Sequence, residues 1–142
     1  MNRKLKLEEL NRLNIEEFKA ADKIPVSIIL DDIRSLNNVG SIFRTADAFK
    51  VQHIYLCGIT AKPPHREITK TALGATESIN WSYHDSIVEL INQLKKAGEK
   101  ILSIEQTVNS IPLNSYLFKK KDSISLIVGN EVEGVSNSAV SL

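Results

Sequence analysis

The chain has 142 residues, of which 42% are hydrophobic and 25% are charged. This length fits one domain with its own core, and the composition excludes a disordered or low-complexity chain. The 18 Lys and Arg residues nearly balance the 17 Asp and Glu residues, so any contact with nucleic acid must come from a local basic patch and not from the overall charge.

Residues 1–23 are predicted to form a helical extension ahead of a core domain at 24–142. Apolar residues recur along 5–21, and Asn14 and Glu17 have the spacing of a capping box. The extension lacks the apolar stretch of a signal peptide, and no apolar run in the chain approaches the length needed to cross a bilayer. We therefore expect a cytoplasmic protein without membrane contacts.

The first strand and helix of the core domain are predicted from "IPVSIIL" at 24–30 and from the helical spacing of apolar residues at 39–49. Between them, 31–40 is expected to be a long polar loop. Arg44 falls beside the apolar stripe of the helix and not on it, so core packing does not explain its presence.

A second strand is predicted from "HIYLC", which ends in Cys57. A single cysteine cannot form an internal disulfide, and its place in an apolar run predicts a buried small hydrophobe and not a catalytic thiol. Paired prolines in the next loop stop regular structure before the short helix "EITKTAL". This region gathers Lys62, His65, Arg66 and Lys70.

The rest of the chain continues the alternation of strands and helices. Ser86 and Glu89 form another capping box, at the start of a helix that Gly98 ends. Strands are predicted at 100–105 and 123–129, and a further helix follows. Short connections between these elements predict an α/β fold with a mostly parallel sheet and helices on both faces.

Ligands of open parallel sheets bind beyond the carboxyl ends of the strands, so the polar loops at 31–40, 58–67, 105–115 and 129–135 are the candidate site. The last of these is no phosphate-binding loop, because no Lys-Ser/Thr pair follows its second glycine. The dinucleotide-binding glycine pattern and the nucleophile elbow are also absent. The 3 histidines have no Cys, Asp or Glu at metal-site spacing, so no metal site is predicted.

Two stretches resemble the signatures of a known family. In "NNVGSIFRTADAF", an Asn-x-Gly turn at Asn38 and Gly40 is followed by Arg44, and "LIVGNEVEGVS" contains Gly-x-Glu-x-x-Gly after an apolar strand. Their order and their places at predicted strand ends are similar to those in the SpoU (TrmH-type) branch of the SPOUT RNA methyltransferases. "KTALGA" and "IEQT" also resemble stretches of this family, so the likeness covers most of 26–136.

The resemblance implies 2′-O-methylation of ribose in structured RNA, tRNA or rRNA, with S-adenosylmethionine as the donor. It also implies a homodimer and a SPOUT-type fold whose C-terminal segment forms a trefoil knot. A third family signature, Ser-Leu-Asn after an Ile-Pro stretch, is expected beyond residue 136 and is not found before Leu142. We therefore expect the knot-forming segment to be missing and the domain to be C-terminally incomplete. The alternative is a catalytically inactive RNA-binding module of the same fold.

The resemblance places Arg44, Asn38 and Glu131 at catalytic positions. A guanidinium stays charged in almost every protein setting, so anchoring an RNA phosphate and aligning the 2′-oxygen suit Arg44 better than acting as a general base. Glu131 is expected to accept hydrogen bonds from Arg44 or from loop amides, and Asn38 to orient Arg44 or the substrate. The predicted cofactor-binding residues are Gly129, Asn130, Glu105, Gln106 and Thr107.

Simpler explanations exist for the same residues. Arg44 would then be a solvated helix residue or a partner of Asp31, Asp32 or Asp47, and Glu131 a solvent-facing acid in a turn. The predicted RNA-binding residues are Arg44, Lys62, His65, Arg66 and Lys70. Further candidates for RNA docking are Arg3, Lys4, Lys6 and Arg12 in the extension and the lysines at 119–121.

Overall fold

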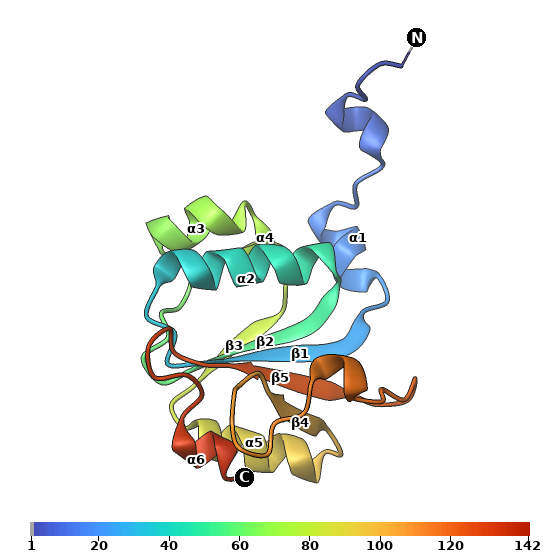
Figure 1. Cartoon of the computed structure of the whole chain (residues 1–142). Helices are drawn as coiled ribbons and strands as arrows, with labels where there is room; N and C mark the ends of the chain where they lie inside the picture. Colours follow the sequence, from blue (N-terminus) through green and yellow to red (C-terminus); the bar gives the residue numbers. More distant parts are fainter. Residues whose placement is uncertain (1) are drawn as a thin grey trace.

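The computed structural model describes residues 2–142 and has a five-stranded parallel sheet at its centre, in the order β3-β2-β1-β5-β4 (Figure 1). The strands are β1 (Ile24–Asp31), β2 (Val51–Cys57), β3 (Trp81–His84), β4 (Lys100–Ser103) and β5 (Ile124–Val128). The predicted α/β class is confirmed. The strand β3 was not predicted, because its four residues, "WSYH", contain no apolar run.

Helices cover both faces of the sheet, as predicted (Figure 1). One face carries α2 (Leu36–Ala48), α3 (Arg66–Ala72) and α4 (Ala75–Ser78), and the other carries α5 (Ile87–Lys96) and α6 (Asn137–Val140). The N-terminal extension contains the 3-10 helix η1 (Leu7–Leu10) and α1 (Ile15–Ala20), and a second 3-10 helix, η2 (Leu113–Ser115), precedes β5. Figure 1 shows η1 projecting away from the rest of the chain, whereas α1 packs against α4.

The helix α2 begins earlier than predicted. Ser35 caps it, because the Ser35 hydroxyl accepts a hydrogen bond from the Asn38 amide at 3.2 Å. Val39 and Phe43 face the core and are fully buried. The expectation of a polar loop through residue 40 is therefore wrong, and both Asn38 and Gly40 are helical.

Gly40 lies where α2 crosses α3. A Cβ built on Gly40 would stand 1.9 Å from the Thr71 hydroxyl and 2.4 Å from the Ile68 carbonyl. Glycine weakens a helix interior by roughly 1 kcal/mol relative to alanine, but here it allows the two helices to approach closely. The signature glycine thus has a packing role in addition to any role in a site.

The opposite face of the sheet forms a second core with α5. Ile29, Ile91 and Ile127 are fully buried there, and Cys57 is 1% exposed. The prediction of a buried cysteine is confirmed, and burial, together with the nearby Asp31 and Asp32, raises the pKa of the Cys57 thiol to about 12. In the part of the chain that the structure describes, no helix is long and apolar enough to cross a membrane.

Candidate functional site

The candidate site lies where the sheet changes its winding direction. The chain runs from β1 outward through β2 to β3, whereas β5 enters the sheet on the other side of β1. The segment after β1 leads to α2 on one face, and the segment after β5 leads to α6 on the other. Such a switch point leaves a crevice between the two strand ends, which is the usual ligand site of open α/β sheets.

Two cavities open at this switch point. The first, the α2 pocket, has a volume of about 440 Å³ and lies between the Asn38 side of α2 and the end of β5. The second, the turn pocket, has a volume of about 470 Å³ and lies between Glu105–Thr107 and the turn after β5. Glu131 lines both cavities, so its carboxylate stands at the boundary between them.

The Glu131 carboxylate binds the amino end of α2. Its two oxygens accept hydrogen bonds from the backbone amides of Arg34 and Ser35, both at 3.0 Å, and from the Asn38 side-chain amide at 2.9 Å. Partial burial acts to raise the pKa of Glu131, but these hydrogen bonds outweigh it and lower the pKa to about 2. Glu131 is therefore an ionised acceptor at the positive end of a helix dipole.

The turn at 130–136 is organised by Asn130. Its side-chain oxygen accepts from the amides of Val132 and Glu133 at 2.9 and 3.0 Å, and its side-chain nitrogen donates to the Asp32 carbonyl at 2.7 Å. Asn130 also exchanges two backbone hydrogen bonds with Gly134. The Asn130 side chain, predicted to bind a cofactor, thus fixes the turn that presents Glu131.

Gly129 is closely approached by its own chain. A Cβ there would lie 2.1 Å from the Gly134 carbonyl carbon and 2.1 Å from the Val135 nitrogen. The predicted reason for this glycine, close approach of a methyl donor, is not needed to explain it. The returning turn already occupies that space, so any side chain would push Gly134 and Val135 outward.

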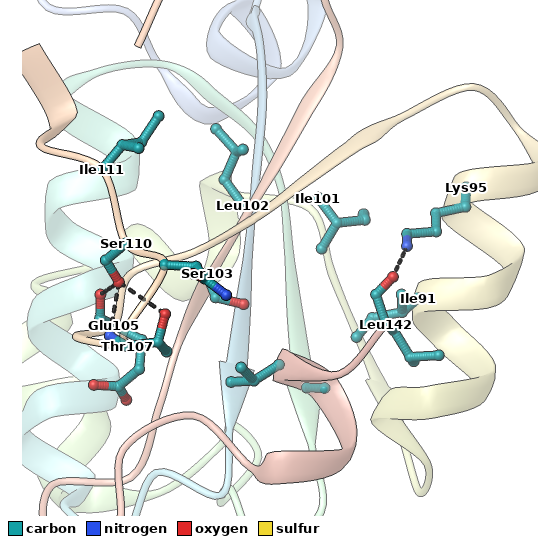
Figure 2. A pocket seen from close by; sticks show the side chains of 13 residues that line it. Ile91, Lys95, Ile101, Leu102, Ser103, Glu105, Thr107, Ser110, Ile111 and Leu142 are labelled. Carbon is teal, nitrogen blue, oxygen red and sulfur yellow. Dashed lines mark hydrogen bonds between the residues drawn. The ribbon is translucent and has the colours of Figure 1, made fainter. Parts of the chain in front are cut away.

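The other wall of the turn pocket begins directly after β4. The Glu105 carboxylate accepts hydrogen bonds from the amides of Gln106 at 2.7 Å and Val135 at 2.8 Å, and both bonds lower its pKa. The Ser110 hydroxyl accepts from the Thr107 amide at 2.7 Å and donates to the Glu105 carbonyl at 3.1 Å (Figure 2). This loop is therefore ordered by its own side chains. A further cavity of about 350 Å³ lies on its other side, between α5, β4 and α6 (Figure 2).

Arg44 does not meet Glu131. It follows Asn38 by six positions, which places the two side chains about 120° apart around the helix axis. Arg44 is exposed and lines neither the α2 pocket nor the turn pocket. Of the two alternative partners expected for Glu131, the structure shows the loop amides and no hydrogen bond with Arg44.

The carboxylates proposed as simple partners of Arg44 are engaged elsewhere. Asp31 accepts a hydrogen bond from the Ser136 amide at 2.7 Å, Asp32 from the Ile59 amide at 2.9 Å, and Asp47 from the Ser78 hydroxyl at 2.6 Å. Among residues 2–142, no salt bridge or side-chain hydrogen bond involves the Arg44 guanidinium. The guanidinium is therefore available to a ligand.

The predicted RNA-binding residues around α3 do not form one unit. The Lys62 ammonium lies over the Tyr83 ring, 4.1 Å from its centroid. His65 caps α3, because its Nδ1 accepts a hydrogen bond from the Glu67 amide at 3.2 Å. Arg66 and Lys70 are exposed one turn apart on α3. They lie on the side of the helix turned away from Ile68 and Ala72, which are buried in the same core as Phe43.

Two contributions to the site were not predicted: Asp31 binds the Ser136 amide, and the backbone amides of Arg34 and Ser35 bind Glu131. Asp31 is 2% exposed, although aspartate is rarely buried without a partner. Its position at the last residue of an apolar strand was a usable signal. The backbone amides have no signal in the sequence, because any residue type supplies them.

Comparison with known proteins gives the family. Residues 25–142 match the model of the SpoU rRNA Methylase family. An uncharacterized tRNA/rRNA methyltransferase of Borreliella burgdorferi is 30% identical over 124 residues, covering 85% of this chain and 51% of that protein. The 23S rRNA (guanosine-2′-O-)-methyltransferase RlmB of Vibrio vulnificus is 23% identical over 128 residues, covering 90% of this chain and 51% of that protein.

A solved structure has the same fold. The AdoMet-bound rRNA methyltransferase of Sinorhizobium meliloti superposes with a TM-score of 0.76 at 23% identity, covering 87% of this chain and 47% of that chain. The present chain spans about half the length of the curated relatives that it matches. The match to the family model extends over nearly the whole core domain, and the chain therefore belongs to the SpoU rRNA methylase family.

Proposed function

We propose that this chain carries the S-adenosylmethionine-dependent 2′-O-methylation of ribose in structured RNA, a tRNA or an rRNA. The observation that carries the proposal is the bonding of Glu131, from the second signature, to Asn38 and the amino end of α2, from the first. Residues from both ends of the domain thereby form one charged, polar site at the switch point. Family membership supports the reaction class.

The turn pocket suits the methyl donor. Its volume of about 470 Å³ falls in the range of small-molecule sites. Gln106, Thr107 and Glu133 line it with amide, hydroxyl and carboxylate groups, which can bind ribose hydroxyls, an adenine edge and an ammonium group. S-adenosylmethionine supplies an electrophilic methyl group when bound. We assign Gln106 and Thr107 to its adenosine half.

Arg44 is proposed to bind an RNA phosphate. It is exposed on α2, and its planar fork of donors matches phosphate oxygens in a bidentate manner. Holding the phosphate fixes the neighbouring ribose, and correct orientation of the 2′-oxygen is a large part of the catalytic task. Asn38 and Glu131 act from the other side of α2 by fixing the amino end of the helix that carries Arg44.

RNA docking is proposed for the exposed side of α3 next to α2. Arg66 and Lys70 project from α3 into solvent, and each phosphate contact adds affinity that falls with salt. Lys62 and His65 are proposed to border this surface. Since Arg44 stands outside the α2 pocket of its own chain, we also propose a homodimer, in which a second copy completes the substrate surface.

Two measurements test the function. Calorimetric titration with S-adenosylhomocysteine is expected to give a saturable isotherm, whereas the alternative function, an inactive RNA-binding module, predicts no heat of binding. Transfer of tritium from labelled S-adenosylmethionine to total tRNA or rRNA is expected for the wild-type chain and is expected to fall at least about a hundredfold in Arg44→Ala, the scale of one lost transition-state contact. Equal transfer by the variant would contradict the role of Arg44.

A further inference from the structure

The backbone amides from Val132 to Ser136, in the turn after β5, all donate to other groups of the protein. Asn130 accepts from the amides of Val132, Glu133 and Gly134. The next two amides are each taken by a carboxylate from a different strand end: Val135 donates to Glu105 and Ser136 donates to Asp31. The turn is therefore held from two other loops, and these amides are not free to bind a ligand.

The Glu105 carboxylate bridges the two walls of the turn pocket. One oxygen accepts from the amide of Gln106, on the wall after β4, and the other from the amide of Val135, on the wall after β5. Both carboxylate oxygens are thereby directed at the protein's own backbone. Charged acceptors make hydrogen bonds roughly twice as strong as neutral ones, so a single side chain sets the spacing of both walls.

The Glu105 carboxylate occupies the space that a side chain at position 134 would fill. A Cβ on Gly134 would lie 2.1 Å from the Glu105 Oε2 atom, and Gly134 has a φ of +72°, which side-chain-bearing residues rarely adopt. Glu105 and Gly134 thus fit one another, although they lie in different loops. The last glycine of the second signature is explained by this contact.

We propose that Glu105 is a positioning residue of the methyl-transfer site, which couples the donor pocket to the amino end of α2. Glu105 fixes Val135, Asn130 closes the same turn, and Glu131 extends from it to the amides of Arg34 and Ser35. A change at Glu105 is therefore transmitted to α2 through a rigid turn. The inference rests on the proposed function for its meaning in catalysis, but the coupling itself is measurable without cofactor.

The test is amide hydrogen exchange, followed by NMR, on the wild-type chain and on Glu105→Gln. The isosteric amide cannot accept two hydrogen bonds from opposite backbone amides. We expect the Val135 amide to exchange about tenfold to a hundredfold faster, the range for loss of one charge-assisted hydrogen bond. We also expect faster exchange of the Ser35 amide and an S-adenosylhomocysteine dissociation constant raised about tenfold.

Gly134→Ala tests the same contact from the opposite side, because its Cβ displaces the Glu105 carboxylate, and it should give the same signature. Glu89→Gln is the matched control, since Glu89 is exposed in the first turn of α5 and is far along the chain from the turn after β5. It should leave the exchange rates of the Val135 and Ser35 amides unchanged. The proposal is overturned if the Val135 amide exchanges faster in Glu105→Gln and Gly134→Ala while the exchange of Ser35 and the dissociation constant stay unchanged. Glu105 would then stabilise only its own turn. If the wild-type chain binds no S-adenosylhomocysteine, the proposed function fails, and the exchange of Ser35 still decides the coupling.

Discussion

Glu131 accepts a hydrogen bond from the side-chain amide of Asn38 at 2.9 Å, although the two residues are 93 positions apart in the chain. The same carboxylate also binds the backbone amides of Arg34 and Ser35. The acid of the second signature therefore caps the helix that carries the first. The two signatures are parts of one structural unit at the switch point of the sheet.

Acid is predicted to weaken this unit. The folded-state pKa of Glu131, about 2, lies below its ordinary value of 4.5, so folding favours the ionised form. The stabilisation is fully present above pH 4.5 and is lost as the pH falls through about 2. Urea unfolding of the wild-type chain and of Glu131→Gln should show a stability difference near neutral pH that disappears over this window. A stability difference that does not change with pH would contradict the stabilisation of α2 by an ionised Glu131.

The substitution Gly40→Ala is predicted to destabilise the fold. At an ordinary helix position alanine is more favourable than glycine by about 1 kcal/mol. Here the added methyl would meet Thr71 and the Ile68 carbonyl of α3, and overpacking of this kind costs about 1–3 kcal/mol. Urea unfolding of both proteins measures the sign of the change in the free energy of unfolding. A stabilised variant would mean that α2 and α3 pack less closely than described.

The thiol of Cys57 is predicted to be inert in the folded chain. Its pKa is raised to about 12 and only 1% of the residue is exposed, so almost no thiolate is available at neutral pH. Labelling with an aromatic disulfide reagent should be slow in buffer and complete in urea. Rapid stoichiometric labelling of the folded chain would contradict the burial of β2 beneath α5.

Much of this architecture was predictable from local patterns, since apolar runs and capping residues are local. Such patterns predicted three features: the buried strand β1, the cap of α5 by Ser86 and the burial of Cys57. The strand β3 was not predictable, because its mixed polar and aromatic residues form a strand only by pairing with β2.

The composition of the site was predictable in part. The resemblance identified Asn38 and Glu131 as site residues, and the structure brings them into contact. It did not predict that the Asn-x-Gly segment is helical, because that depends on capping by a carboxylate distant in sequence. Nor did it predict that Arg44 lines neither pocket at Glu131, because the start of α2 sets the rotation of every side chain along it.

Replacing Arg44 by lysine is predicted to be nearly as damaging to methyl transfer as replacing it by alanine. Lysine keeps the charge but cannot offer two parallel donors to one phosphate. The rate of tritium transfer from S-adenosylmethionine to RNA, measured for both variants at equal protein concentration, tests this. Full activity of Arg44→Lys would show that only a positive charge is required there.

A double-mutant cycle on methyl transfer with Asn38→Ala, Glu131→Gln and the double variant tests most directly whether the two signatures form one site. If the two signatures act through the bond between Asn38 and Glu131 as one unit, the double variant loses no more activity than the more damaged single variant. Losses that multiply, with the double variant as slow as the product of the two single effects, would contradict a shared site.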